Sequence, residues 1–340
     1  IGRLSKEAGM AMIVPEFWAE ARVGERFGRG HVSGRHSLTV RRFGWSDTSL
    51  ADAQAMADAR AREAFDRILA GESLAKRDPR VPYDAEGLPI REPVVERDGD
   101  CVVTRNSYGA RCLNSPNVLF ADIDFAPPAS GWRAWHFWIA LAVGVASGFW
   151  IKAWIGVVSF LVLLWLFSRI ARATMARRHR TGEGGPEARA MAPVHAFVAA
   201  NPDWHLRVYR TPNGFRLLAM HRLFDPLDPT VPEFFKAIGA DSYYALLCQR
   251  QHCFRARLSP KPWRIGIRQR MPPRSGLWPI APERMPERER WVAEYERKSE
   301  GYAACRFVEA LGSRDYVSAT QGVQRMHDTM CKADRDLPLA

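Results

Sequence analysis

The chain has 340 residues, 47% of them hydrophobic and 25% charged, which is the composition of a folded globular protein. These values exclude a disordered chain, a collagen-like chain and a small disulfide scaffold. The length suits two or three domains, or one large domain with an insertion. The formal net charge is +12, with 49 Lys and Arg residues against 37 Asp and Glu residues, and only seven of the 49 are Lys. Either a GC-rich genome or a polyanionic partner, nucleic acid or anionic lipid, accounts for this excess of Arg.

The cysteines and the first residue place limits on the compartment and the start of the chain. Six Cys residues without a secretory leader indicate reduced, cytosolic thiols. The first residue is Ile1, so the natural start is Met10 or Met12, or the sequence is a fragment.

The first 130 residues predict a mixture of helix and strands. Ile13–Arg22 is expected to form a short helix, and His36–Phe43 alternates as a strand does. Asp47 or Ser49 can cap a helix over Leu50–Ala70 that ends at Gly71. After a connector rich in Pro and charge, the expected strands are Cys101–Arg105, Tyr108–Leu113 and Asn117–Phe125.

Residues 137–167 form a long apolar segment, FWIALAVGVASGFWIKAWIGVVSFLVLLWLF, in which Lys152 is the one ionisable residue. As a single helix the segment would be about 46 Å long, against a hydrocarbon core of about 30 Å. Two membrane arrangements fit: one span over Ala153–Ile170, or a hairpin of short spans, Trp135–Ile151 and Ala153–Ile170, that turns at Lys152. The alternative is a buried helix pair, although soluble helices rarely lack a polar face for so long.

The flanking residues favour the hairpin and predict its orientation. Trp150 and Trp154 bracket Lys152, as expected at a membrane interface. Arg133 precedes the first arm, and a group of Arg residues follows the second: Arg169, Arg172, Arg177, Arg178 and Arg180. Both basic flanks are expected in the cytoplasm, with the hairpin in the inner membrane of a bacterial cell and lipid as a partner.

The remainder of the chain predicts further strands and a helical end. Residues 181–190 are expected to be a flexible linker before a helix at Ala192–Ala200. Strands His205–Arg210 and Phe215–His221 are joined by Thr211-Pro-Asn-Gly214, a strong hairpin signal. The other expected elements are a helix over Pro232–Cys248, a strand over Phe254–Leu258, and helices near Glu287–Lys298, Tyr302–Leu311 and Tyr316–Ala333.

The sharpest candidate site is Asp122-Ile-Asp124 at the end of an apolar strand. Residues i and i+2 project to one face, so both carboxylates converge on one point. The carboxylates repel each other unless a cation lies between them, and their oxygens suit Mg²⁺ or Mn²⁺. The alternative is a solvated strand end.

Two further candidates are basic and lie later in the chain. In the hairpin YRTPNGFRLL, Arg210 and Arg216 flank the turn, which can lay Thr211, backbone N–H groups and a guanidinium along a phosphate chain. The segment CFRARLSPKPWRIGIR follows Asp241 and interleaves basic residues with an aromatic one, which suits a nucleic-acid backbone and a stacked base. The alternatives are an ordinary hairpin and a basic surface loop.

In this order, the three segments resemble the catalytic core of the archaeo-eukaryotic primase (primase-polymerase) superfamily. Asp122 and Asp124 match its DxD pair, and Thr211, Gly214 and Arg216 match its hairpin motif, although His is usual at the position of Arg216. The third acid is matched by Asp241, and the basic residues after it by Arg257 and Lys261. The resemblance covers about 117–125 and 191–270, and the apolar segment interrupts it.

The resemblance implies an α+β fold: an RRM-like antiparallel sheet with flanking helices, an inserted transmembrane hairpin and a helical C-terminal region. The expected divisions are 1–130, the hairpin at 131–180, the linker at 181–190, the second half of the core at 191–280 and the helical end at 281–340. It further implies a nucleotidyltransferase that holds Mg²⁺ or Mn²⁺ on Asp122, Asp124 and Asp241 and acts on nucleotides or single-stranded nucleic acid. Thr211, Gly214, Arg216, Arg257, Lys261 and Arg264 would bind the phosphates.

Two other functions remain open, and other polar groups have simpler explanations. A membrane glycosyltransferase also uses a DxD metal site, but no nucleotide-binding strand clearly precedes the pair; an inactive membrane adaptor needs no acids. Cys248 and Cys253 with His252 do not have a standard zinc spacing, and Cys101 and Cys112 pair with them only if the fold brings them close. His327-Asp328 is expected to be a surface cap or a core contact.

Overall fold

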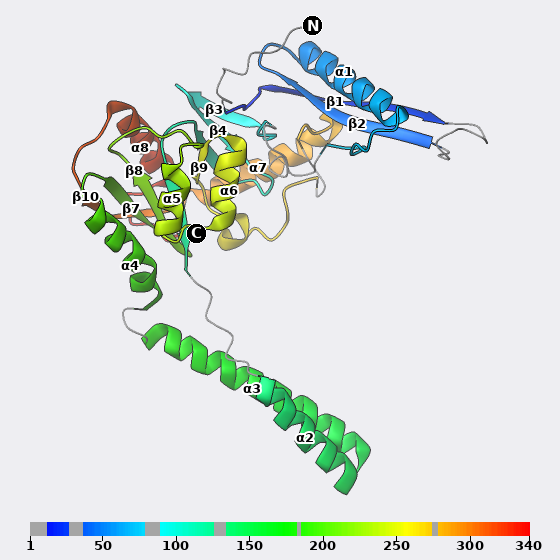
Figure 1. Cartoon of the computed structure of the whole chain (residues 1–340), viewed down its shortest axis with the longest axis vertical. Coiled ribbons are helices and arrows are strands. Elements are labelled where there is room, and N and C mark those ends of the chain that lie inside the picture. Colours follow the sequence, from blue (N-terminus) through cyan, green and yellow to red (C-terminus); the bar gives the residue numbers. More distant parts are fainter. Residues whose placement is uncertain (1–11, 27–36, 79–88, 126–133, 182–184, 274–277) are drawn as a thin grey trace.

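The computed structural model describes residues 12–26, 37–78, 89–125, 134–181, 185–273 and 278–340, and side chains are not described at 175–181. It is a mixed α+β structure with three antiparallel sheets (Figure 1). The α+β expectation is therefore confirmed at this level.

The N-terminal unit is a two-stranded hairpin covered by one helix. β1 (Phe17–Arg26) pairs antiparallel with β2 (Ser37–Ser46), and α1 (Leu50–Leu69) packs across both strands. The expected helix over residues 13–22 is wrong, because ten residues of β1 pair in register with β2 and tertiary pairing overrides local preference. The prediction of α1 is confirmed, with Ser49 Oγ accepting a hydrogen bond from the N–H of Asp52 at 3.1 Å.

A second sheet is formed by β3 (Val94–Asp98), β4 (Cys101–Arg105), β5 (Arg111–Ser115) and β9 (Phe254–Arg257), in that spatial order. β5 begins later than the expected strand at residue 108 because Asn106 closes a turn. The Asn106 side chain accepts hydrogen bonds from the N–H groups of Tyr108 and Ala110. β9 comes from a distant part of the chain and brings Arg257 to the edge of this sheet.

The third sheet has the order β10-β7-β8-β6 and carries the Asp pair. Its strands are β6 (Phe120–Asp124), β7 (His205–Thr211), β8 (Gly214–Ala219) and β10 (Arg306–Gly312). The expected hairpin between β7 and β8 is confirmed. β10 replaces the helix expected over residues 302–311, because this segment pairs with the outer edge of β7 despite its helix-forming residues.

Helices cover both faces of this sheet. α8 (Ser318–Cys331) lies on one face, where the His327 ring contacts the rings of Phe120 and Tyr209. α4 (Gly185–Ala200) and α5 (Thr230–Ala237) pack on the other face through Phe197 and Phe234, whose rings contact Trp204. A single core of buried apolar side chains runs through these layers.

Three expected boundaries in this half of the chain are corrected. The helix expected over residues 232–248 is two helices, α5 and α6 (Ser242–Gln251), because Gly239 adopts φ +68° and Asp241 caps the second. The linker expected over 181–190 is mostly helical, since α4 begins at Gly185; residues 182–184 lie outside the described part. The C-terminal region contains short 3₁₀ turns (Pro262–Ile265, Pro282–Arg284), α7 (Met285–Ser299), β10 and α8.

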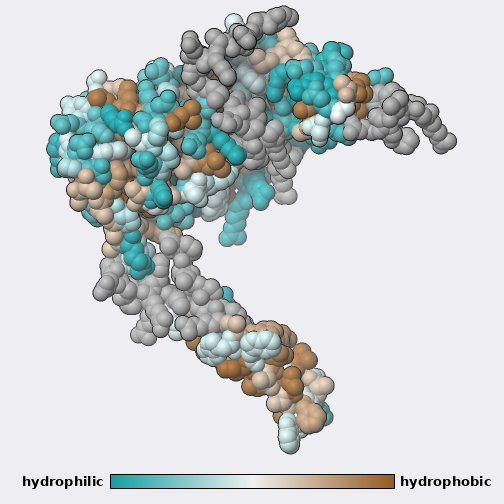
Figure 2. Space-filling view, in the orientation of Figure 1, coloured by the Kyte–Doolittle hydropathy of each residue, from teal (hydrophilic) through white to brown (hydrophobic). Residues whose placement is uncertain are grey.

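The apolar segment forms two helices, α2 (Ala134–Trp150) and α3 (Ala153–Thr181), that pack side by side (Figure 1). Glycines form the contact: a Cβ on Gly156 would lie 2.5 Å from Gly144 O and 2.7 Å from Gly148 Cα. Hydrophobic side chains are prominent on the outer surface of the pair (Figure 2). Among the described helices, one stretch, Ala153–Thr174, is long and apolar enough to cross a membrane, with a mean hydropathy of 2.0; α2 is apolar but shorter.

Candidate active site

Residues from five segments of the chain surround one polar cavity of about 160 Å³. Its lining comes from β6, the β7–β8 turn, the start of α6, β9 and the 3₁₀ turn that follows β9. The lining residues are Asp122, Asp124, Thr211, Asn213, Phe215, Asp241, Tyr244, Arg257, Lys261 and Arg264. The structure thus brings together seven of the nine predicted site residues, and the other two, Gly214 and Arg216, are not part of the lining.

Strand and helix geometry brings three aspartates to the lining of the cavity. Asp122 and Asp124 share a face of β6, as the period of two requires. Asp241 is fixed beside them by its own backbone: its N–H donates to Asp122 O at 3.0 Å, and its Oδ1 accepts from the N–H of Tyr243 at 2.9 Å. Tyr244, one turn into α6, donates its hydroxyl to Phe120 O at 2.9 Å and holds the helix against β6.

The two strand carboxylates have opposite electrostatic environments. Burial favours the protonated form of Asp122, but the charge and hydrogen bonds of Arg216 outweigh burial and lower the pKa of Asp122 below its usual value. The pKa of Asp124 is raised by partial burial and by the negative charges of Asp122 and Asp241. The positive charges of Lys261 and Arg257 offset only part of this increase, and the repulsion that remains among the carboxylates favours a divalent cation.

Arg216 is the partner of Asp122 and is only 1% exposed. Its Nε and Nη2 donate to the two carboxylate oxygens of Asp122 at 2.8 and 3.0 Å, and its Nη1 donates to Arg257 O at 2.8 Å. A guanidinium so enclosed does not reach a phosphate in the cavity. The expectation that Arg216 binds phosphate is therefore corrected: its two hydrogen bonds fix the orientation of the Asp122 carboxylate.

The structure explains why position 214, which was expected to bind nucleotide, is a glycine. It pairs with Asp124 across β8 and β6, and a Cβ at this position would collide with the backbone oxygen of Ile123. The glycine permits the β7–β8 hairpin to approach β6 closely, and so brings Thr211 and Asn213 to the cavity.

Three of the residues that line the cavity are basic: Arg257, Lys261 and Arg264. Burial and the neighbouring charges of Arg257 and Arg264 lower the pKa of Lys261, and burial and Arg257 lower that of Arg264. Among the described residues, Arg257 Nε and Arg264 Nη1 are buried atoms without a hydrogen-bond partner. Crowded cations favour an anion in the cavity, because an anion would relieve their repulsion.

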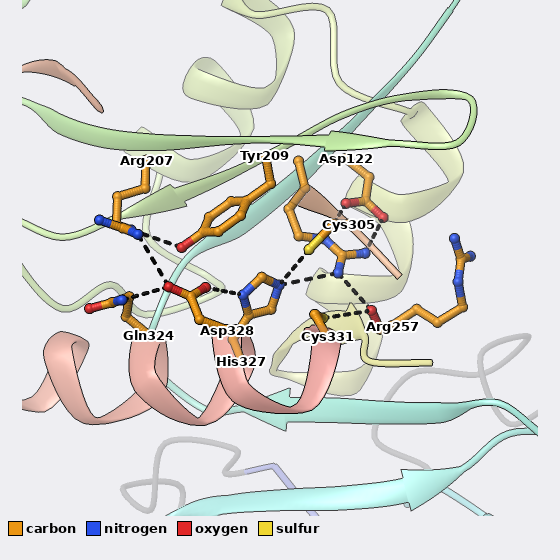
Figure 3. Close-up of polar contacts among 10 residues, drawn as sticks. Asp122, Arg207, Tyr209, Arg257, Cys305, Gln324, His327, Asp328 and Cys331 are labelled. Carbon is orange, nitrogen blue, oxygen red and sulfur yellow. Dashed lines mark hydrogen bonds and ion pairs between the residues drawn. The ribbon is translucent and has the colours of Figure 1, made fainter. Parts of the chain in front are cut away.

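Next to Arg216 lies a buried polar network that the sequence did not indicate (Figure 3). His327 Nδ1 hydrogen bonds to Asp328 Oδ1 at 2.9 Å, and its Nε2 lies 3.4 Å from Arg216 Nη1. Asp328 Oδ2 accepts further bonds from Arg207 at 3.2 Å and from Gln324 at 2.6 Å. His327 is therefore a buried contact, one of the two readings left open, but one connected to Asp122 through Arg216.

None of the four cysteines considered for a zinc site, Cys101, Cys112, Cys248 and Cys253, belongs to a group with metal-binding spacing among the described residues. All six cysteines are buried and free. His252, in the left-handed conformation at φ 51°, ends α6 between Cys248 and Cys253. The one group of three His, Cys, Asp or Glu side chains with metal-binding spacing in the described residues is Cys305, His327 and Cys331, so the three carboxylates of the cavity are not within 4.8 Å of one another.

Comparisons of the chain with protein-family models, with curated proteins and with solved structures found no match. The residues of the cavity are therefore the basis for assigning a function.

Proposed function

We propose that the cavity is the active site of a metal-dependent nucleotidyltransferase, with a catalytic core of the primase-polymerase kind. The observation that supports this most directly is that one small cavity is lined both by an acidic group, Asp122, Asp124 and Asp241, and by a basic group, Arg257, Lys261 and Arg264. Carboxylates that hold Mg²⁺ or Mn²⁺ opposite cations that hold phosphate are the two parts that phosphoryl transfer requires. The four-stranded antiparallel sheet that carries the acids is consistent with the RRM-like core.

The size of the cavity limits what it can enclose. About 160 Å³ is less than the roughly 300–1,000 Å³ of pockets that enclose a whole ligand. We propose that metal and phosphates occupy the cavity and that the base lies outside it. Trp263 is 54% exposed between Lys261 and Arg264, and its ring lies 5.5 Å from Lys261 Nζ, so it offers a surface on which a base can stack.

Each residue then has a defined task. Asp124 and Asp241 would supply two carboxylate ligands to the metal, and Asp122, oriented by Arg216, would supply a third whose side chain is 32% exposed. The metal, when bound, polarises the phosphoryl oxygen and stabilises the leaving pyrophosphate. Thr211 and Asn213 would donate to phosphate oxygens from the turn, while Arg257, Lys261 and Arg264 would supply positive charge.

Metal-dependent stabilisation tests this proposal. We expect Mg²⁺ or Mn²⁺ to raise the melting temperature by mass action, and a nucleoside triphosphate analogue to raise it further. Asp124→Asn and Asp241→Asn should each abolish the metal effect, and Lys261→Ala should reduce the nucleotide effect. Asp98→Asn, an exposed acid at the end of another strand, is the matched control and should retain both effects.

The same variants separate the proposed reaction from its alternatives. The wild-type protein should incorporate labelled nucleotide opposite a single-stranded template, and Asp124→Asn should not. A metal effect that depends on Asp122 and Asp124 but survives Asp241→Asn would instead favour a glycosyltransferase. If Mg²⁺ and Mn²⁺ do not raise the melting temperature of the wild-type protein, the result would contradict a metal-dependent enzyme. A membrane adaptor without catalytic activity would then be the remaining function.

We further propose that α2 and α3 insert as a hairpin into the cell membrane and that the remainder of the protein lies on its cytoplasmic side. Large apolar side chains cover the outside of the pair; Phe149 and Trp150, near the turn, are 84% and 83% exposed. Small residues at the contact are typical of helices packed in lipid. Arg169 and Arg172 follow the apolar part of α3, as the charge bias for cytoplasmic flanks requires.

Sidedness tests the hairpin directly. Reporter fusions at positions 130 and 184 should both report the cytoplasm, because β6 and β8, which pair in one sheet, lie on either side of the helix pair in sequence. Opposite sidedness would show a single span and would contradict the hairpin.

A further inference from the structure

A second cluster of metal-binding side chains lies on the same face of the active-site sheet as Phe120 and Asp122, next to the buried guanidinium of Arg216. It comprises Cys305, just before β10, and His327 and Cys331, four residues apart on α8. The three residues are at most 1% exposed, and their Sγ and Nε2 atoms all lie within 4.8 Å of one another. Residues four apart lie on one face of a helix, so α8 presents an imidazole and a thiol together to Cys305.

The distances suit a thiophilic ion. Zn–N and Zn–S bonds of about 2.0 and 2.3 Å at a tetrahedral angle place N and S about 3.5 Å apart. His327 Nε2 and Cys305 Sγ are 3.8 Å apart. A set of two thiolates and one imidazole selects Zn²⁺, whereas the carboxylates of the cavity select a hard ion such as Mg²⁺.

The orientation of His327 is already that of a metal ligand. Its Nδ1 is engaged by Asp328 Oδ1 at 2.9 Å, which directs Nε2 toward the two sulfur atoms (Figure 3). Asp328 is itself fixed by Arg207 and Gln324. A carboxylate on the far nitrogen of a liganding His is the usual second-shell partner in zinc sites, where it fixes the ring and the tautomer.

The nearby guanidinium is compatible with an ion because the charges balance. Arg216 Nη1 lies 3.4 Å from His327 Nε2, but Arg216 is neutralised by its two bonds to Asp122. Binding of Zn²⁺ would release one proton from each Cys, so two thiolates would cancel the charge of the ion. The Cys331 thiol donates to Arg257 O at 3.6 Å, and loss of that proton would leave this oxygen bonded to Arg216 Nη1.

We propose that Cys305, His327 and Cys331 bind one Zn²⁺ ion, a structural centre that joins α8 to the sheet and sets the position of Arg216 behind Asp122. The site is independent of the cavity proposed for Mg²⁺ or Mn²⁺, and its ion does not contact substrate. A measurement can therefore contradict the zinc site without contradicting the proposed nucleotidyltransferase activity, and the reverse also holds.

Metal analysis of the full-length protein, purified in detergent under reducing conditions, tests the proposal. We expect about one zinc per chain, released by a chelator with a fall in melting temperature, and about two protons released when zinc is added back. Co²⁺ in its place should give thiolate-to-cobalt charge-transfer absorption. Cys305→Ser and Cys331→Ser should lose the zinc and the absorption, whereas Cys253→Ser, at an equally buried thiol outside the cluster, should retain both.

Two results would overturn the site. One is wild-type protein that, when folded by circular dichroism, takes up neither Zn²⁺ nor Co²⁺ with thiolate absorption. The other is a zinc content unchanged in the double variant Cys305→Ser and Cys331→Ser. The cobalt spectrum is measured on the wild-type chain, so it decides the question even if a variant fails to fold.

Discussion

The two aspartates of β6 should affect stability in opposite directions. Asp122→Asn removes the one carboxylate that pairs with Arg216, a guanidinium with 1% exposure, and leaves the buried charge unpaired. Asp124→Asn removes a carboxylate that is repelled by Asp122 and Asp241. Without metal, we expect the first change to destabilise the protein and the second to stabilise it slightly.

The magnitude follows from the burial of the pair. Breaking a buried ion pair by removing one partner costs about 3–5 kcal/mol of the free energy of unfolding. We expect the lower value, about 3 kcal/mol, because the Asp122 side chain is 32% exposed to the cavity and partly hydrated. At about 2–4 °C per kcal/mol, the melting temperature should fall by roughly 6–12 °C. For the exposed Asp124 the gain should be below about 1 kcal/mol.

The pH dependence gives the two effects opposite signs. Because Arg216 lowers the pKa of Asp122, the stability from the pair is present above the unfolded-state pKa, roughly 4, and is lost as the pH falls through the lower folded value. The pKa of Asp124 is raised, so the folded state loses stability as the pH rises from roughly 4 through that higher value. The gain from Asp124→Asn should therefore appear at neutral pH and disappear in acid.

Thermal melts of the metal-free protein in detergent at neutral and acidic pH provide the assay. The double variant Asp122→Asn with Arg216→Met should recover part of the stability lost in Asp122→Asn, since it removes the unpaired guanidinium as well. Equal effects of Asp122→Asn and Asp124→Asn at neutral pH would refute the assignment of Arg216 as the partner of one carboxylate alone.

Further predictions concern the helix pair and the basic group. Gly156→Val should separate α2 from α3 and lower the melting temperature in detergent, because its Cβ would lie 2.5 Å from a backbone oxygen, whereas Gly148→Ala, whose Cβ has its nearest neighbour at 3.5 Å, should be tolerated. Single-stranded nucleic acid should bind weakly and with strong salt dependence, and replacing Lys261 and Arg264 with Ala should flatten the dependence of log affinity on log salt. An unchanged salt slope in the double variant would mean that other Arg residues carry the binding.

Local patterns in the sequence predicted the parts of the site that depend on neighbouring residues. The period of two put Asp122 and Asp124 on one face, and the turn between β7 and β8 placed Thr211 beside them. Asp241 was found through the order of motifs in a family, since nothing near it in the sequence shows that its N–H bonds to the backbone of β6.

Features set by distant contacts were not predictable in this way. The direction of the Arg216 side chain depends on its register opposite Asp122 and on α8 beneath it, and the sequence near Arg216 contains neither. The same holds for β10, because its residues favour a helix locally, and its strand conformation depends on pairing with the edge of β7. The break between α5 and α6 was in principle visible at Gly239, where a positive φ ends the first helix.

The helix pair lies in the sequence between β6 and β8, two strands of one sheet, and this position sets an order of assembly during synthesis. β6 is synthesised before α2 and α3, but its partner β8 and the basic group follow them. The ring of Trp135 lies 6.2 Å from that of Phe167, so the pair returns the chain close to its starting point and shortens the loop that β6 and β8 must close. A growing chain can therefore complete the cavity only after the helix pair has been made, and a nascent protein whose pair fails to form would expose an unpaired β6 edge in place of a finished site.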